Sequence, residues 1–318
     1  MIYKNILETI GSTPIVKLNS IGSDLDCNLY VKLEMFNPGG SVKDRVAFSM
    51  IDCAEKEGKI KPGDTLIEAT SGNTGIGLAL AAAVRGYKLI ICMPEKMSME
   101  KEITIKALGA KIVRTRTEAC HDECDSNFGV AKQLNEDIPR SHILDQWENM
   151  CNPETHYNHT SQEILDDFGT DLDMVVMGVG TGGTISGVGK RLKEQIPDIK
   201  IIGADPYGSI LGGEDEYKGS PYQVEGIGYD FFPQVFDQNI VDEFVKVNDK
   251  EAFATARALI KEEGLLIGGS CGSATFAALK AAKSLKKGQN CLIILPDSIR
   301  NYMRKFLSDD WMKEHDLI

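Results

Sequence analysis

Short apolar runs alternate with longer amphipathic stretches along most of the chain. Each run holds four to seven residues, as a buried strand does, and the stretches between them have the spacing of one apolar helix face. Strands are predicted at residues 29–33, 65–69, 87–93, 111–114, 174–177, 200–204 and 291–295. Helices are predicted at residues 44–57, 99–108, 119–135, 156–168, 185–195, 251–263 and 274–284, and one more follows a glycine-rich turn and ends at residue 84.

Strands that alternate with helices of this length predict βαβ units and parallel sheets. The chain has 318 residues, enough for about two domains of ~150 residues. We therefore expect two α/β units, one mostly from residues 41–147 and one from residues 148–318. Ligands in such folds bind at the carboxyl ends of the strands, where this chain has its glycine-rich loops.

The composition excludes several classes of partner. The formal net charge is −12, which disfavours a sequence-independent nucleic-acid binder and an anionic membrane surface. No segment approaches the ~20 apolar residues of a membrane span, and the N-terminus lacks the apolar core of a signal peptide. A cytoplasmic location is therefore expected, where the eight cysteines would remain thiols.

The first segment with candidate chemistry is a turn-rich loop at residues 37–42 that leads into a helix at Lys43. A helix N-terminus is unfavourable for a cation, so a partly buried lysine there would have a lowered pKa. The neutral amine is the better nucleophile for a Schiff base. The commoner alternative is an exposed lysine without a catalytic role.

Two further glycine-rich loops lie between a strand and a helix. Residues 70–75, T-S-G-N-T-G, offer hydroxyls, an amide and backbone N–H groups that suit a carboxylate or a phosphate, or serve only as a helix cap. Residues 178–184 match G-x-G-x-x-G, and Asp205 follows Gly183 by 22 positions. This is the dinucleotide fingerprint, so an NAD-dependent dehydrogenase remains a distant alternative.

The remaining candidates are weaker when taken one at a time. Residues 268–274 precede a helix, so Ser270 is either a capping residue or a hydroxyl that faces a ring nitrogen. Cys120 and Cys124 with His121 lack a second ligand pair, and His156 with His159 more often cap or pack, so no metal is expected. The acidic run at residues 214–216 is expected to be a solvated loop.

In their order along the chain, these segments resemble the fold-type-II pyridoxal-phosphate enzymes, and within them the catalytic core of the cystathionine β-synthase and cysteine synthase family. N-P-G-G-S-V-K-D-R at 37–45 is similar to the family's lysine loop, T-S-G-N-T-G at 70–75 to its substrate-carboxylate loop, and G-T-G-G-T at 180–184 to its phosphate loop. The stretches at 225–230 and 295–303 favour the cystathionine β-synthase branch.

The resemblance implies a fold like that of the tryptophan synthase β subunit. It consists of two three-layer α/β/α domains with mostly parallel sheets and the cofactor between them. The smaller domain would be 41–147, and residues 1–40 would join 148–318 in the larger one. The resemblance also implies a homodimer. No haem segment is expected before this core and no regulatory modules are expected after it, because the core begins near Met1 and ends near Ile318.

The same resemblance assigns roles to individual residues. Lys43 would hold pyridoxal phosphate and act as the catalytic base, Asn73 would bind the ring hydroxyl, and Ser270 would face the ring nitrogen. The cofactor phosphate would lie on the loop formed by Gly180, Thr181, Gly182, Gly183 and Thr184. Substrates would contact Thr70, Ser71, Asn73, Thr74, Gln146, Gly228 and Tyr229. Trp147 stands where a tyrosine or phenylalanine is expected, beside the second-substrate pocket.

The implied reaction is β-replacement on L-serine or L-cysteine through an aminoacrylate intermediate, with homocysteine as the thiol and cystathionine as the product. Cysteine as the first substrate would release hydrogen sulfide. A cysteine synthase that uses O-acetylserine and sulfide is the near alternative. A binding protein that retains the cofactor without catalysis is a third possibility, which the presence of Lys43, Asn73 and Ser270 disfavours.

Overall fold

A computed structural model describes the chain apart from residues 1, 71, 96, 117–118, 120–122 and 214–215. The chain forms two compact units. Unit 1 contains residues 1–10 and 37–152, and unit 2 contains residues 11–36 and 153–318. The first ten residues, expected with the larger domain, cluster with unit 1 because Leu7 is buried in its hydrophobic core.

Unit 1 is built on a parallel four-stranded sheet with the order β5-β4-β3-β6. Its strands are β3 (Thr65–Ala69), β4 (Lys88–Pro94), β5 (Lys111–Thr115) and β6 (Ser141–Ile143). Its helices are η1 (Ile6–Thr9), α1 (Lys43–Lys56), α2 (Asn73–Arg85), α3 (Met99–Ala107) and α4 (Asn127–Asp137).

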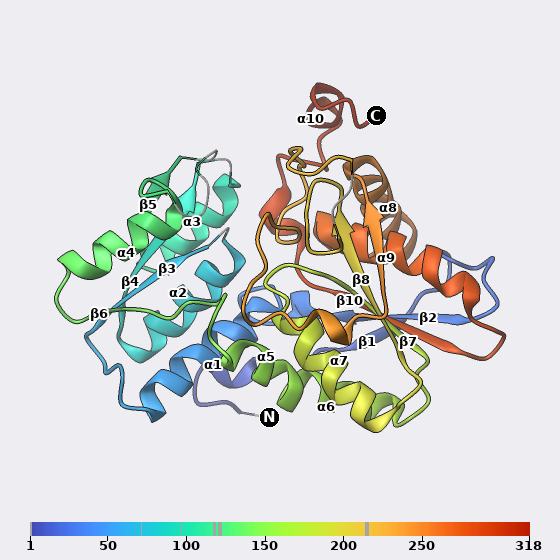
Figure 1. The fold of residues 1–318 in the computed structure, drawn as a ribbon, viewed down its shortest axis with the longest axis horizontal. Helices are drawn as coiled ribbons and strands as arrows, with labels where there is room; N and C mark the ends of the chain where they lie inside the picture. The colour runs from blue at the N-terminus through green and yellow to red at the C-terminus, as the bar shows by residue number, and fades with distance from the viewer. Residues whose placement is uncertain (1, 71, 96, 117–118, 120–122, 214–215) are drawn as a thin grey trace. The chain divides into compact units, whose positions relative to one another are not determined.

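Alternate residues of the β3 strand point to opposite faces of this sheet, and each face is covered by helices. Leu66 packs in one cluster with Val46 of α1 and Ile76 of α2. Ile67 packs in the other with Ala131 of α4. Unit 1 therefore has three layers, with α1 and α2 on one face and α4 on the other (Figure 1).

Unit 2 is built on a six-stranded sheet with the order β1-β2-β10-β7-β8-β9, in which only the edge pair β1–β2 is antiparallel. Its strands are β1 (Ile15–Lys17), β2 (Asn28–Leu33), β7 (Met174–Gly178), β8 (Lys200–Pro206), β9 (Glu243–Val247) and β10 (Asn290–Leu295). Its longer helices are α6 (Ser161–Phe168), α7 (Gly183–Gln195), α8 (Asp249–Glu263), α9 (Gly269–Ala281) and α10 (Asp309–Glu314). Shorter turns are η2 (Glu34–Phe36), the π-helical η3 (His156–Thr160), η4 (Gln238–Ile240), η5 (Ala282–Ser284) and η6 (Ile299–Tyr302), and α5 (Cys151–Thr155) crosses from unit 1.

The central strand β10 shows how this sheet is buried on both faces. Ile293 lies in the cluster formed with α8 and α9, whereas Leu292 and Ile294 lie in the cluster formed with α6 and α7. Figure 1 shows α8 and α9 on one side of these strands and α6 and α7 on the other. The predicted α/β class with layered, mostly parallel sheets is confirmed.

The largest errors of the sequence analysis are at element boundaries. The helix predicted at 119–135 begins at Asn127, because the Ser126 hydroxyl caps it by accepting the Gly129 N–H at 3.0 Å. The helix predicted at 274–284 begins five residues earlier, at Gly269. The strands β1, β6 and β9 were not predicted.

The sequence analysis expected no membrane-spanning helix and no metal site. Among the described residues, no helix is both long and apolar enough to cross a bilayer, and no group of His, Cys, Asp or Glu side chains is arranged to hold a metal ion. Cys120, His121 and the start of the acidic run at 214–216 lie outside the described residues.

The expectation that every cysteine is a thiol is wrong for one pair in unit 1. Cys53 of α1 and Cys151 of α5 form a disulfide, although they are 98 positions apart in the sequence. The fold brings their Cα atoms to 6.8 Å, within the range that a disulfide spans. The Ser49 hydroxyl also donates to the Cys151 carbonyl at 3.1 Å, so α1 is attached to α5 by two adjacent contacts.

Candidate active site

Lys43 is the first residue of α1 and is half-buried. The loop before it is held by its own side chains. The Ser41 hydroxyl accepts the Lys43 N–H at 3.2 Å, and the buried Asp44 carboxylate accepts the Gly39 N–H at 2.5 Å. These bonds fix the direction in which the lysine leaves the backbone.

The second predicted loop ends at the start of α2, where Asn73 is the first helical residue. Gly72, at the N-cap, has a φ of 132° and no side chain with which to cap the helix. The Thr70 hydroxyl accepts the Gly72 N–H at 3.2 Å and holds the turn. The first N–H groups of α2 therefore form a place where an anion is favoured. Ser71 lies outside the described residues.

The starts of α1 and α2 lie close together inside unit 1, and a glycine in α2 makes this approach possible. A Cβ on Gly77 of α2 would lie 3.0 Å from the Lys43 carbonyl oxygen and 2.9 Å from the Ala47 Cβ, both in α1. Only a glycine fits this close approach without displacing a neighbour. The candidate lysine and the candidate carboxylate loop are thus parts of one packed pair of helices.

Gln146 belongs to the same group in the structure. Its side chain is buried, and its amide oxygen accepts the Thr74 hydroxyl of α2 at 2.6 Å. Its amide nitrogen donates to the Ala69 carbonyl at the end of β3, at 3.4 Å. The next residue, Trp147, is buried with its ring 5.7 Å from the ring of Phe128 in α4.

Glu68 in β3 is a buried carboxyl group that the sequence analysis did not single out. Its two oxygens accept the backbone N–H groups of Asp145 and Gln146, each at 3.0 Å. Burial raises the pKa of Glu68 to about 8, and the nearby Asp145 carboxylate adds to the effect. An acidic residue inside an apolar strand, next to the T-S-G-N-T-G loop, was the available signal.

The raised pKa of Glu68 predicts a pH dependence of stability. The carboxyl keeps its proton up to about pH 8 in the folded protein, but only to its ordinary pKa near 4.5 when unfolded. The folded state binds more protons in this window, so the free energy of unfolding falls as pH rises, by up to about 1.4 kcal/mol per pH unit. Urea unfolding of the wild type and Glu68→Gln between pH 5 and 8 checks this, because the variant lacks this titration. Equal slopes for both proteins would contradict the prediction.

In unit 2, the predicted phosphate loop leads into α7. A Cβ on Gly180 would overlap the Gly226 carbonyl oxygen, and one on Gly182 would overlap the Phe236 side chain. Gly182 is the N-cap, with a φ of 82°, and it too has no side chain with which to cap the helix. The glycines thus leave backbone N–H groups at the positive end of α7, which suits a phosphate.

Thr184 in the first turn of α7 is oriented by a buried histidine. The Nε2 atom of His156 lies 3.2 Å from the Thr184 hydroxyl, and its Nδ1 atom lies 2.9 Å from the Thr160 hydroxyl. His156 is fully buried, in agreement with its interpretation as a packing residue rather than a metal ligand. Its link to the predicted phosphate loop was not foreseen.

Gly228 and Tyr229 lie beside the same loop. The Gly228 N–H donates to the Val179 carbonyl at 2.8 Å, which joins this segment to the residue before Gly180. The Tyr229 N–H donates to the Ser209 hydroxyl at 3.0 Å. The structure therefore brings together the predicted phosphate loop and the residues predicted to meet the second substrate.

Ser270 is the second residue of α9 and is buried. The segment after β10 packs against the start of this helix, because a Cβ on Gly268 would overlap the Asp297 carboxylate. The Tyr302 hydroxyl donates to that carboxylate at 2.5 Å, and the Cys271 thiol lies 3.5 Å from the Asp297 carbonyl oxygen. The stretch at 295–303 thus supports the element that carries Ser270.

Asp205, the acidic residue of the apparent dinucleotide fingerprint, has a structural role in unit 2. It is fully buried, and its carboxylate accepts the Lys246 ammonium at 2.8 Å and the Gly212 N–H at 2.9 Å. A carboxylate held in this way links β8 to β9 and is not presented to a ribose hydroxyl. The geometry removes the support for an NAD site.

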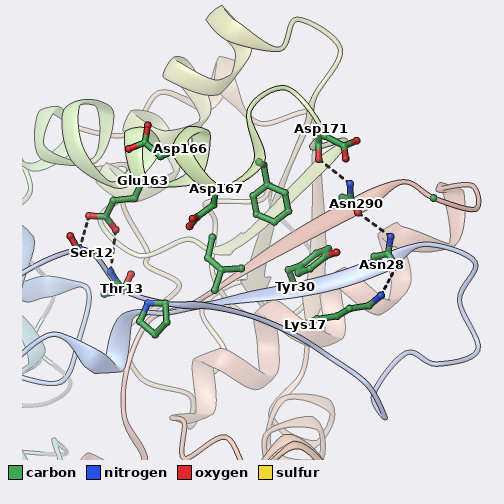
Figure 2. Close-up of a pocket in the computed structure, with 14 residues that line it drawn as sticks. Ser12, Thr13, Lys17, Asn28, Tyr30, Glu163, Asp166, Asp167, Asp171 and Asn290 are labelled. Carbon is green, nitrogen blue, oxygen red and sulfur yellow. Dashed lines mark hydrogen bonds between the residues drawn. The ribbon is translucent and has the colours of Figure 1, made fainter.

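Unit 2 also has an open pocket of about 800 Å³ between β1, β2 and α6, and none of the predicted site residues line it (Figure 2). Its most buried carboxylate, Glu163, accepts the backbone N–H of Ser12 at 2.9 Å and pairs with Lys32 at 2.8 Å. Lys17 donates to Asn28 at 2.8 Å. These groups hold the edge of the sheet.

An amine at a helix start, two helix N-termini that favour an anion and a mostly parallel α/β fold agree with the class of protein that the family model gives. The family model of the pyridoxal-phosphate dependent enzymes matches residues 6–297, and the chain belongs to this family. The predicted dependence on pyridoxal phosphate is confirmed.

Three similar proteins have more specific names than the family. The chain is 55% identical to a cystathionine beta-synthase of Dictyostelium discoideum over all of its own length, but spans only 64% of that relative. An O-acetylserine dependent cystathionine beta-synthase from Helicobacter pylori is 42% identical, with a TM-score of 0.88 over 96% of this chain and 98% of the other. A hydrogen sulfide-producing enzyme from Fusobacterium nucleatum is 38% identical, with a TM-score of 0.89 over 95% and 100%.

Gly180, in the predicted phosphate loop, allows a test of how the chain binds its cofactor. Gly180→Ala would push against a backbone carbonyl, that of Gly226, and such overpacking costs about 1–3 kcal/mol. We expect pyridoxal phosphate to bind roughly 10- to 100-fold more weakly, measured by fluorescence titration of cofactor-free protein. Lys190→Ala, at an exposed position of the same helix, is the control. Unchanged affinity in Gly180→Ala would show that the phosphate lies elsewhere.

Proposed function

We propose that this protein catalyses β-replacement on L-serine or L-cysteine, with homocysteine as the second substrate and cystathionine as the product. The observation that carries the proposal is the arrangement in unit 1. The helix that begins with Lys43 packs directly on the helix whose uncapped start is joined to Gln146 through Thr74. An amine and a carboxylate site held at adjacent helix starts suit the binding of an α-amino acid.

In this proposal, the residues of unit 1 bind and deprotonate the amino acid. Its carboxylate is bound by Thr70, Ser71, Asn73, Thr74 and Gln146. Asn73 also binds the ring hydroxyl of the cofactor. Lys43 holds the cofactor covalently and, once displaced by the substrate, takes the proton from the substrate Cα. Bound pyridoxal phosphate supplies an electron-withdrawing ring that stabilises the negative charge left on that carbon.

Within unit 2, the proposal assigns roles to the loop before α7, to Ser270 and to the segment at Gly228. The N–H groups of residues 180–184 hold its phosphate at the positive end of α7, and the His156–Thr184 bond supports this arrangement. Ser270 faces the ring nitrogen, where a neutral hydroxyl does not enforce a protonated ring and so favours elimination over transamination. Gly228 and Tyr229 line the approach of the thiol.

A second candidate differs in the leaving group. The Helicobacter pylori relative, 42% identical, is described as O-acetylserine dependent, and the Fusobacterium nucleatum relative as hydrogen sulfide-producing. The likeness to the Helicobacter pylori protein favours O-acetylserine as the amino-acid substrate of this chain. The likeness to the Fusobacterium nucleatum protein favours cysteine as that substrate, with release of hydrogen sulfide.

The test is a steady-state comparison of L-serine, L-cysteine and O-acetylserine, each with homocysteine, and of O-acetylserine with sulfide. Cystathionine from serine at the highest kcat/KM supports the proposal. A strong preference for O-acetylserine with sulfide would replace it with cysteine synthase activity. Sulfide release is measured directly in the cysteine reaction.

A homodimer and a cytoplasmic location complete the proposal. Sedimentation equilibrium of the full chain tests the first. For the second, cell fractions are probed for the protein by immunoblotting, and recovery mainly outside the cytoplasmic fraction would argue against that location.

A further inference from the structure

Glu68 ends the regular pairing between β3 and β6. The last paired residues are Ile67 and Ile143, and the chain after β6 then turns away from the sheet. Glu68 meets this turn with its side chain, because its two carboxyl oxygens accept the N–H groups of Asp145 and Gln146 at 3.0 Å each. The carboxyl group thus replaces the backbone carbonyls that would otherwise continue the pairing.

The turn that Glu68 holds contains an unfavourable backbone conformation. Asp145 has a φ of 57°, in the left-handed region that residues other than glycine adopt at a cost. The Asp145 carboxylate accepts the Trp147 N–H at 3.0 Å, and its carbonyl accepts the Asn149 N–H at 2.9 Å. The turn is therefore fixed from several sides, and Glu68 supplies the bonds from the sheet.

The consequence of this turn is the placement of Gln146. Its backbone N–H is bonded to Glu68, its carbonyl accepts the Asn152 side-chain amide at 2.8 Å, and its side chain bridges Ala69 and Thr74. A rotation at Asp145 would move the Gln146 amide away from the Thr74 hydroxyl. We propose that Glu68 is a positioning residue that orients Gln146, and through it Thr74, for the carboxylate of the amino-acid substrate. This inference rests on the proposed function of Gln146 and Thr74.

The experiment compares the wild type with Glu68→Gln and with Glu136→Gln, which alters an exposed carboxylate on α4 of the same unit. Glutamine has an NH2 group, which cannot accept, in place of one carboxyl oxygen, so one of the two backbone N–H groups loses its partner whether or not Glu68 carries its proton. We expect KM for L-serine to rise about tenfold with kcat within about twofold, since a lost bond to a buried group has an effect of this order. We also expect hydrogen exchange of the 144–149 backbone to accelerate about tenfold. Glu136→Gln should change neither.

A double-mutant cycle tests whether Glu68 acts through Gln146. In a Gln146→Ala background, Glu68→Gln should raise KM by less than twofold, because the side chain that it orients is gone. A full tenfold increase there would overturn the proposal, as would an unchanged KM in Glu68→Gln alone. If Glu68→Gln does not fold, Asp145→Ala disturbs the same turn from its other side and should raise KM in the same way; an unchanged KM in Asp145→Ala would then overturn the proposal.

Failure of the proposed function would be recognised separately. In that case the wild type itself would form no product from any of the amino acids. The exchange measurement needs no substrate and would still decide whether Glu68 fixes the backbone of Gln146. Unaccelerated exchange in Glu68→Gln would overturn the inference on its own.

Discussion

Replacing Lys43 by alanine is expected to lower kcat for β-replacement by about a thousandfold or more. The substitution removes the amine that holds the cofactor and the group that moves the Cα proton, and a positioned acid–base group alone contributes about 10²–10⁴-fold. The visible absorption band of the lysine-bound cofactor should disappear in the same variant. Both effects are measured on purified protein saturated with pyridoxal phosphate.

The matched control is Lys56→Ala at the other end of α1. Its side chain is 76% exposed and its ammonium pairs with Asp52 at 2.7 Å, so its removal should leave kcat within about twofold. A Lys43→Ala enzyme that retained both its activity and its absorption band would show that another lysine holds the cofactor.

Loss of the Cys53–Cys151 disulfide is expected to lower the free energy of unfolding of unit 1 by about 2–4 kcal/mol. The bond closes a loop of 98 residues in the sequence, and long loops gain the most from closure because the unfolded chain is constrained. Urea unfolding of Cys53→Ser, and of the wild type with a dithiol reductant, should give the same shift of the midpoint. Cys124→Ser changes an exposed thiol that is free in the structure and serves as the control.

The reductant separates the disulfide from other effects of the serine substitution. It should shift the wild type and leave Cys53→Ser unchanged. If the wild type unfolded at the same urea concentration with and without reductant, the disulfide would contribute nothing. A peptide map without reduction, in which Cys53 and Cys151 appear as one linked pair, establishes that the bond is formed in the sample used.

The sequence predicted the long elements because their signals are local. The apolar runs at β3, β4, β7 and β10 and the glycine loops before α2 and α7 are each readable within a dozen residues. β6 escaped prediction because its three residues, Ser-His-Ile, are only half-buried and gain their strand conformation by pairing with β3. β1 is similarly short and is paired only along β2, at the edge of its sheet.

The residues of the candidate site that the sequence analysis did not predict depend on contacts between positions far apart in the sequence. Glu68 meets Asp145 and Gln146 across 77 and 78 positions, and His156 meets Thr184 across 28. Nothing in the local pattern around His156 separates a histidine that orients Thr184 from one that fills space. Lys43, Asn73 and Ser270, by contrast, lie at helix starts, where the family motif and the local structure coincide.

The contact at Gly77 has a mechanical consequence. Since main-chain and Cβ atoms of α1 lie against it, the separation of Lys43 and Asn73 is set by the thickness of two helix backbones rather than by rotatable side chains. A displacement of α1 would therefore carry the backbones of Lys43 and Asn73 together. The packing of the two helices therefore fixes the distance between these two backbone segments. Substitutions at exposed positions of either helix can accumulate without changing that distance.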